Sequence, residues 1–192
     1  MTKNILFFNE VSIKDVGLVG GKNASLGEMI NNLTSKGVPI PDGFATTAPA
    51  FFSFLKNTGL ESRIEKILEN LDTHNIKDLQ VAGKTIRESI VAATLPESLQ
   101  KDIADAYKKL SKEYGAENVD VAVRSSATAE DLPNASFAGQ QETFLNISGE
   151  ANVIGPSKSV LPRFLRTEPS LTGKKWDFLI CKSGFRPACK KW

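Results

Sequence analysis

The chain contains one double glycine, Gly20-Gly21, and Lys22 follows it directly. Glycines allow the backbone to turn tightly and to approach a ligand closely. The apolar spacing predicts a helix over residues 23–35, so the N–H groups and dipole of its first turn would face this bend. With the positive charge of Lys22, the arrangement favours binding of a nucleotide phosphate, although the spacing of a Walker A loop is absent. The alternative is an ordinary glycine turn with a solvated Lys22.

Arg124 is the second candidate, because it ends the apolar, β-branched run 119–123, which predicts a strand. A guanidinium at the end of a buried strand can hold phosphate oxygens through two hydrogen bonds. The long segment 124–140 is rich in small and hydroxyl residues, and its backbone N–H groups can bind an anion. The alternative is a surface loop in which Arg124 pairs with Glu130 or Asp131.

Composition excludes several other classes of function. The formal net charge of +2 argues against a nucleic-acid binder, and no apolar run is long enough to cross a membrane. The apolar patch at residues 5–8 is too short for a signal peptide, so we expect a cytoplasmic protein. Cys181 and Cys189 are too few for a disulfide framework or a zinc site. The single histidine, His74, lies in a polar segment typical of a surface turn.

The candidates need an α+β framework to position them. Pro39 and Pro41 prevent continuation of the first helix, Gly37 is a natural stop, and Thr47 is a plausible N-cap for the next one. The pattern predicts strands over residues 5–11, 43–46, 119–123 and 142–147, and helices over residues 23–35, 49–56, 60–71, 79–91 and 96–110. The last two strands and the segment between them form a strand–loop–strand unit.

Three segments resemble the phosphoenolpyruvate synthase (pyruvate, water dikinase) family. They are VGGKNASLGEM at 19–29, VPIPDGFATTAPAF at 38–51 and AVRSSATAEDLPNASFAGQQETFLN at 122–146. The resemblance covers about Ile5 to Ile154 and implies the N-terminal part of the family's ATP-binding domain. The implied fold is the first lobe of an ATP-grasp-like domain, in which a helical insert accompanies a small β-sheet.

The resemblance also implies the roles of particular residues. In the family, the lysine of the GGK turn and the arginine of the VRSSAT segment contact ATP phosphates, and these roles fall on Lys22 and Arg124. The glycine and threonine of the AGQQET segment line the nucleotide site, which indicates Gly139 and Thr143. Residues 136–141 resemble the loop that covers the phosphates.

The family reaction uses ATP and Mg²⁺ to phosphorylate a histidine on a swivelling domain, releasing AMP and phosphate, and the phosphohistidine then phosphorylates pyruvate on a barrel domain. We see no counterpart here of the histidine domain, the barrel or the acidic magnesium ligands. The resemblance therefore assigns no catalytic and no metal-binding residue to this chain. ATP is its expected partner, pyruvate binds only in the full-length enzyme, and no nucleic acid or membrane is expected. Whether the chain is itself an enzyme stays open; alone, we expect it to be inactive and to bind ATP weakly.

Other functions remain open at this point. A rifampicin-phosphotransferase-type dikinase shares both motifs and differs in its acceptor. Pyruvate, phosphate dikinase fits less well, because a different loop is expected after its arginine. Outside the enzymes, the chain could be a non-catalytic nucleotide-binding module. The choice between phosphoenolpyruvate synthase and the rifampicin-phosphotransferase type depends on domains downstream of the matching segments, and the adjacent gene sequence would settle it.

The composition changes near residue 154. Residues 1–154 contain 15 basic and 20 acidic residues, whereas residues 155–192 contain 9 basic and 2 acidic ones. Three prolines, beginning with Pro156, predict no long helix there. We interpret 155–192 as a poorly ordered, non-family tail produced by a frameshift, because back-translated codons read two bases later give a peptide similar to the family's continuation. The alternative is a genuine basic tail that binds RNA or a membrane.

Overall fold

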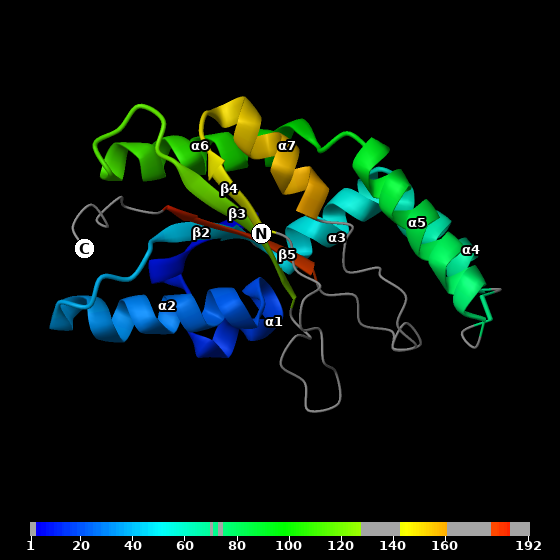
Figure 1. Ribbon diagram of the computed structural model, residues 1–192, viewed down its shortest axis with the longest axis horizontal. Helices are drawn as coiled ribbons and strands as arrows, with labels where there is room; N and C mark the ends of the chain where they lie inside the picture. The colour runs from blue at the N-terminus through cyan, green and yellow to red at the C-terminus, as the bar shows by residue number, and fades with distance from the viewer. Residues whose placement is uncertain (1–2, 70, 73–74, 128–142, 161–177, 185–192) are drawn as a thin grey trace.

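A five-stranded antiparallel sheet forms the centre of the molecule (Figure 1). The computed structural model describes residues 3–69, 71–72, 75–127, 143–160 and 178–184. The strand order is β1-β2-β5-β3-β4. The strands are β1 Ile5–Phe7, β2 Gly43–Thr46, β3 Val121–Ala127, β4 Thr143–Ile147 and β5 Phe178–Gly184. Because β5 pairs with both β2 and β3, it joins the N-terminal strands to the predicted strand–loop–strand unit.

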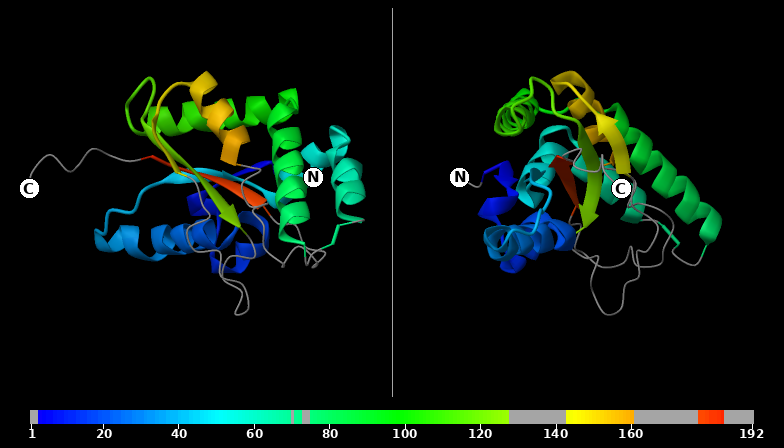
Figure 2. Two further views of the ribbon diagram at one scale, coloured as in Figure 1. Left: turned by 45° about the vertical axis from the view of Figure 1, so that its right-hand side comes forward. Right: turned by 60° about the vertical axis from the view of Figure 1, so that its left-hand side comes forward.

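Helices cover both faces of this sheet. The α-helices are α1 Val16–Val19, α2 Gly21–Leu33, α3 Ala48–Asn57, α4 Leu60–Glu69, α5 Ile76–Ala92, α6 Glu97–Glu113 and α7 Glu150–Val160, and the short 3-10 turns are η1 Phe8–Glu10, η2 Ile13–Asp15 and η3 Thr34–Lys36. Figures 1 and 2 show α1 and α2 on one face, α6 and α7 on the other, and α4 and α5 projecting to one side. The predicted α+β class is confirmed, with the helices α3 to α6 inserted between β2 and β3.

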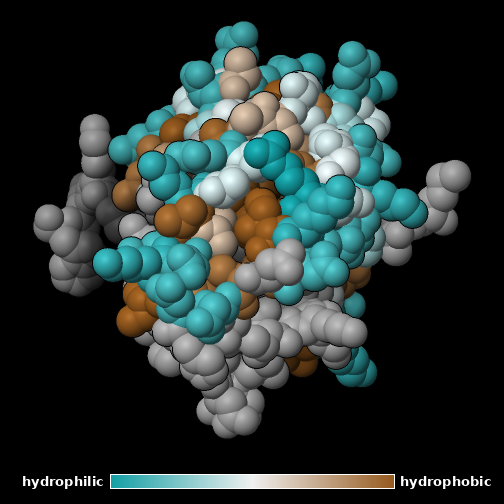
Figure 3. All heavy atoms as spheres, turned by 90° about the vertical axis from the view of Figure 1, so that its right-hand side faces the viewer, coloured by the Kyte–Doolittle hydropathy of each residue, from teal (hydrophilic) through white to brown (hydrophobic). Residues whose placement is uncertain are grey.

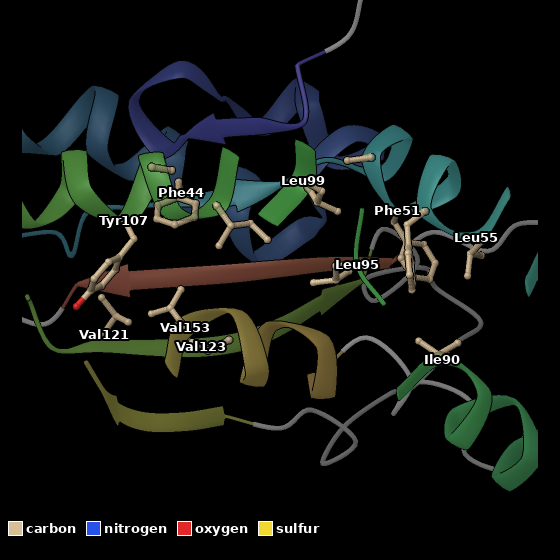
Figure 4. Close-up of a cluster of buried hydrophobic side chains, with 14 of the residues drawn as sticks. Phe44, Phe51, Leu55, Ile90, Leu95, Leu99, Tyr107, Val121, Val123 and Val153 are labelled. Carbon is tan, nitrogen blue, oxygen red and sulfur yellow. The ribbon is translucent and has the colours of Figure 1, made fainter. Parts of the chain in front are cut away.

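The buried apolar residues form two clusters, one on each face of the sheet. The larger one joins α3 to α7 with one face of the sheet and includes Phe44, Tyr107, Val123 and Val153 (Figure 4). The smaller one lies on the α2 face and contains Phe8, Val11, Val19, Ala24 and Ala45. The adjacent β2 residues Phe44 and Ala45 belong to different clusters, as the alternation of side chains along a strand requires. Each face of the sheet therefore has its own core.

Local signals in the sequence placed the five predicted helices to within three residues of their observed ends. The Thr47 side chain caps α3 by accepting a hydrogen bond from the Ala50 N–H at 3.4 Å. Gly37 follows η3 with a left-handed φ of 81°, a conformation that glycine adopts without strain. The predicted strand over 5–11 is wrong in its second half, because the chain turns into η1 at Phe8. Phe8 is fully buried there in the smaller cluster, so tertiary packing overrides the apolar run.

The segment predicted to be a non-family tail contributes backbone to two described elements. Helix α7 continues through Pro156 to Val160, so this proline does not end the helix although it donates no hydrogen bond to the preceding turn. Strand β5 also lies in this segment. The rest of it, with Cys189, Pro162 and Pro169, lies outside the described residues, as does His74. The domain boundary at residue 154 stays a prediction.

The surface formed where α4 and α5 project is mostly hydrophilic, with apolar atoms at its centre (Figure 3). Helix α5 contributes Ile76 and Val81, each 66% exposed, to the molecular surface. Within the described part of the chain, no helix combines the length and the apolar character that crossing a bilayer would require.

Candidate phosphate-binding site

Strand β3 directs Arg124 to the face of the sheet on which α2 lies. The prediction that Arg124 ends the strand is wrong, because pairing with β5 extends β3 to Ala127. Val121 and Val123 are buried in the larger core, against α6 and α7. Because successive side chains of a strand point to opposite faces, Ala122 and Arg124 point to the α2 side. Helix α2 contacts β3 directly. The start of α2 also lies next to the carboxyl end of β3 in all three ribbon views (Figures 1 and 2).

The double glycine lies at the start of α2, where Gly20 is the N-cap and Gly21 is the first residue of the helix. Gly20 has φ 80° and ψ 157°, a backbone conformation accessible almost only to glycine, and it ends α1 and caps α2 at once. Gly20 offers no capping side chain, and the first turn of α2 contains no acidic residue. The helix's own first turn therefore supplies no carboxylate that would neutralise the positive end of its dipole. Lys22, the second residue of the helix, is exposed and adds a positive charge at this end.

Gly27 fixes how closely α2 approaches the rest of the molecule. A Cβ atom at this position would lie 2.7 Å from the Phe8 carbonyl oxygen and would clash with the backbone of Val11. Only glycine therefore permits the observed packing of α2 against η1. The small residues Gly20, Ala24 and Gly27 recur at helical spacing, which is the sequence signal for this close approach.

Two buried side-chain atoms in the described residues have no hydrogen-bond partner, and both belong to this region. One is Nε of Arg124 and the other is Oδ1 of Asn23, the residue after Lys22. Asn23 is fully buried, and its Nδ2 donates to the Val19 carbonyl at 2.6 Å, which fixes Oδ1 as the remaining acceptor. Buried polar groups without partners are costly in proteins and call for an explanation such as a ligand or an ordered water. Sequence reasoning had singled out Arg124 but not Asn23.

Thr143 is the third predicted residue that reaches this region. It is the first residue of β4, is exposed, and pairs directly with Arg124 across the two strands. Side chains of directly paired residues lie on the same face of a sheet, so the Thr143 hydroxyl shares the face of Arg124. Gly139 and the predicted covering loop 136–141 lie outside the described residues, as do Glu130 and Asp131, the alternative partners of Arg124.

A hollow of the described structure lies away from these residues. It has a volume of about 450 Å³ between β1 and α6, and Lys3, Glu10 and Asp102 are among its lining residues. Its charges are largely satisfied internally, since Lys3 pairs with Glu10 at 2.6 Å and Asn4 donates to Asp102 at 2.8 Å. Among the residues that the structure describes, no group of three or more His, Cys, Asp or Glu side chains could hold a metal ion. No metal ligand is therefore assigned in this part of the chain.

The site combines three features: a helix start with no side-chain cap, a lysine in the first turn of that helix, and an arginine on the adjoining strand. This arrangement is typical of proteins that bind phosphate groups. Comparison with known families agrees with this class. Residues 16–169 match the model of the pyruvate phosphate dikinase, AMP/ATP-binding domain. The chain belongs to this family. The match includes all three described candidates and extends past the predicted boundary at residue 154.

The chain is similar to several proteins named phosphoenolpyruvate synthase. It is 55% identical to that of Aquifex aeolicus over 187 residues, which cover 97% of this chain and 22% of the relative. It is 53% identical to that of Neisseria meningitidis over 149 residues (78% of this chain, 19% of the relative). For that of Escherichia coli the identity is 49% over 156 residues (81% and 19%). The chain therefore spans about a fifth of the length of these relatives.

Proposed function

We propose that this chain is the N-terminal part of the ATP-binding domain of a phosphoenolpyruvate synthase. The whole enzyme would convert pyruvate, ATP and water into phosphoenolpyruvate, AMP and phosphate through a phosphohistidine. The observation that carries the proposal is the position of Lys22 and Arg124, which stand at the start of α2 and on the adjoining face of β3. The names of the relatives support the choice of pyruvate over an antibiotic as the acceptor.

In this proposal, the two cations and the start of α2 hold the phosphate groups of ATP. The N–H groups of the first turn donate to phosphate oxygens, and Lys22 neutralises their charge. Arg124 donates from its guanidinium, whose Nε has no partner in the described structure. The Thr143 hydroxyl and the backbone of Gly139 complete the set. A planar guanidinium and a helix start recognise oxyanions better than they recognise a base or a sugar.

The finer features of the domain are part of the same proposal. We assign the sheet and its helices to the first lobe of an ATP-grasp-like fold, because the β3–β4 unit and the start of α2 face one another. Mg²⁺ would accompany the ATP phosphates and neutralise their charge, but no residue of this chain is assigned to it. The cytoplasm remains the predicted location, and residues 155–192 remain a predicted frameshifted tail. Sequencing the gene across codons 150–160 tests the tail, since an intact reading frame would exclude the frameshift.

Isothermal titration of the chain with ATP tests the proposed site. A charge-assisted hydrogen bond contributes roughly 1.5–3 kcal/mol, so Lys22→Ala and Arg124→Ala should each weaken binding by about tenfold or more. Because binding by the parent chain is expected to be weak, this amounts to loss of a detectable signal. The matched controls are Lys36→Ala, at the far end of the same helix segment, and Arg63→Ala on α4, both exposed. Unchanged affinity in both test variants would place the anion site elsewhere.

The extent of the chain's own activity needs a separate assay. The purified chain is incubated with ATP, Mg²⁺ and pyruvate, and the formation of AMP is measured. We expect none, because the proposal places the phosphohistidine and the pyruvate site in other parts of the enzyme. Pyruvate-dependent AMP formation by this chain alone would contradict the proposal. If longer forms of the protein bind ATP as this chain does but form no AMP from ATP and pyruvate, a non-catalytic nucleotide-binding module would be favoured instead.

A further inference from the structure

The pairing of β3 with β4 contains one extra residue on β4. Val121 pairs with Ile147, but Val123 pairs with Phe144, and Arg124 with Thr143. Two steps along β3 therefore correspond to three steps along β4, which defines a β-bulge. The bulge falls at Leu145 and Asn146.

Asn146 has the left-handed backbone conformation that is typical of one class of β-bulge. Its φ is 56°, and it is the only non-glycine residue with a positive φ among those the structure describes. Asparagine enters the left-handed region far more readily than most residues, whereas a β-branched residue there is a genuine outlier. The neighbouring Leu145 side chain is 63% exposed, so it is directed away from the core.

The bulge decides which β4 side chains face the core and which face the site. Phe144 and Ile147 both pack against the larger cluster, although they are three residues apart and would point to opposite faces in a regular strand. The extra residue between them brings both side chains to the same face of the sheet. Thr143 then shares the face of Arg124, whereas a regular strand that kept the pairing of Ile147 with Val121 would put Phe144 opposite Arg124.

We propose that Asn146 is a positioning residue, whose left-handed backbone absorbs the extra residue of β4 and thereby sets the Thr143 hydroxyl beside Arg124. That the ligand held by this pair is ATP rests on the proposed function. The strand register itself does not. Bulges occur preferentially at sheet edges and next to functional sites, where they redirect side chains, and β4 is an edge strand.

Three changes at this position separate the proposal from a general effect on folding. Asn146→Gly keeps access to the left-handed region, and Asn146→Val removes it. Deletion of Asn146 removes the extra residue while leaving Val121–Ile147, Val123–Phe144 and Arg124–Thr143 as possible partners in a regular strand. The deletion should therefore preserve the site that the valine substitution disturbs.

ATP titration by NMR and thermal unfolding are measured for the parent chain and each variant. We expect the dissociation constant to stay within about threefold for Asn146→Gly and for the deletion, and to rise about tenfold or more for Asn146→Val. If Asn146→Val does not fold, Asn146→Ala takes its place, with a smaller rise in the same direction. The proposal would be overturned if the dissociation constant did not change in Asn146→Val, or in Asn146→Ala where that variant replaces it. It would also be overturned if the deletion variant bound ATP as weakly as Asn146→Val.

Backbone NOEs read the strand register without reference to ATP. Contacts between residues 124 and 143 are expected in the parent, in Asn146→Gly and in the deletion, and contacts between 124 and 144 in Asn146→Val. If 124 still contacts 143 in the valine variant, Asn146 does not set the register. If the parent fails to bind ATP while the register changes as expected, the proposed function is wrong and the positioning role of Asn146 stands.

Discussion

On the sheet face covered by α6 and α7, β3 contributes Val121 and Val123, which are 2% and 0% exposed. On the face covered by α2, the same strand contributes Ala122 and the partly exposed Arg124. Polar groups differ in the same way. The Tyr107 hydroxyl on the first face donates to the Val119 carbonyl at 2.8 Å and accepts from the Gly149 N–H at 2.9 Å. On the second face, Arg124 Nε has no partner among the described residues.

This difference indicates a division of roles within a single strand. The α6/α7 face contributes apolar burial and satisfied hydrogen bonds, which stabilise the fold. Among the described residues, the α2 face contains small residues and the partnerless Arg124 Nε–H, a donor that costs stability when unpaired and is suited to an anion. Changes on the first face should therefore alter unfolding, and changes on the second should alter ligand binding.

The largest effect is expected in the larger core. Phe54 is fully buried in that cluster, so Phe54→Ala should lower the free energy of unfolding by about 3–5 kcal/mol. The partly buried Phe52 on the same helix is the matched control, and Phe52→Ala should cost clearly less. Urea denaturation followed by circular dichroism measures both. Equal losses would show that burial does not distinguish these two positions.

Gly27 allows the second face to be changed without altering any charged group. Gly27→Ala should lower the free energy of unfolding by about 1–3 kcal/mol, because its Cβ meets backbone atoms of η1. It should also weaken ATP binding, since α2 must move. Gly17→Ala on α1 meets nothing within 4 Å and serves as the control, with a neutral or slightly favourable effect. If both substitutions behave alike in thermal unfolding, the close approach of α2 is not constrained.

Tyr107→Phe removes one hydroxyl from the first face. The Gly149 N–H then loses its partner, so the free energy of unfolding should fall by about 1–3 kcal/mol. ATP affinity of the folded protein should not change, which sharpens the contrast with Arg124→Ala. Chemical denaturation and ATP titration are compared on the same preparation. If Tyr107→Phe lowered ATP affinity without lowering the free energy of unfolding, Tyr107 would belong to the ATP site instead.

The smallest effect belongs to the exposed rim near β1. The hydrogen bond from Lys3, with that from the Phe7 N–H, holds the pKa of the Glu10 carboxyl below its ordinary value of 4.5. A lowered folded-state pKa adds stability that is present above the ordinary value and is lost as pH falls through the folded-state value. Because the pair is exposed, Glu10→Gln should cost at most about 0.2–1 kcal/mol at neutral pH. In denaturation curves, the difference from the parent should begin to shrink as pH falls below about 4.5 and should vanish below the lowered folded-state pKa; a constant difference would exclude this cause.

Short-range signals in the sequence predicted the helices and the caps well. The apolar stripes of α4, α5 and α6 follow helical spacing, and Thr47 and Gly37 act through contacts within a few residues. Lys22 and Arg124 were also singled out as candidates from their local setting, although the strand end predicted at Arg124 is wrong, because β3 continues to Ala127. In each case the determining interaction is local, so the sequence contains it directly.

Features that depend on pairing between distant segments were not predicted. The bulge at Asn146 follows from the register of β4 on β3, and the requirement for Gly27 follows from its contact with η1. The place of β5 between β2 and β3 also depends on long-range pairing. The burial of Asn23 belongs to the same class, since only the packed structure shows that its Oδ1 is enclosed. No local pattern of residue types reports such contacts.

The most direct measurement is a map of amide chemical shifts in the chain as ATP is added. The account predicts that the shifts concentrate at residues 20–24, at the end of β3 and at Thr143, and that Tyr107 and Val153 on the α6/α7 face do not respond. Shifts that concentrate on the α6/α7 face, or along the hollow between β1 and α6, would contradict it.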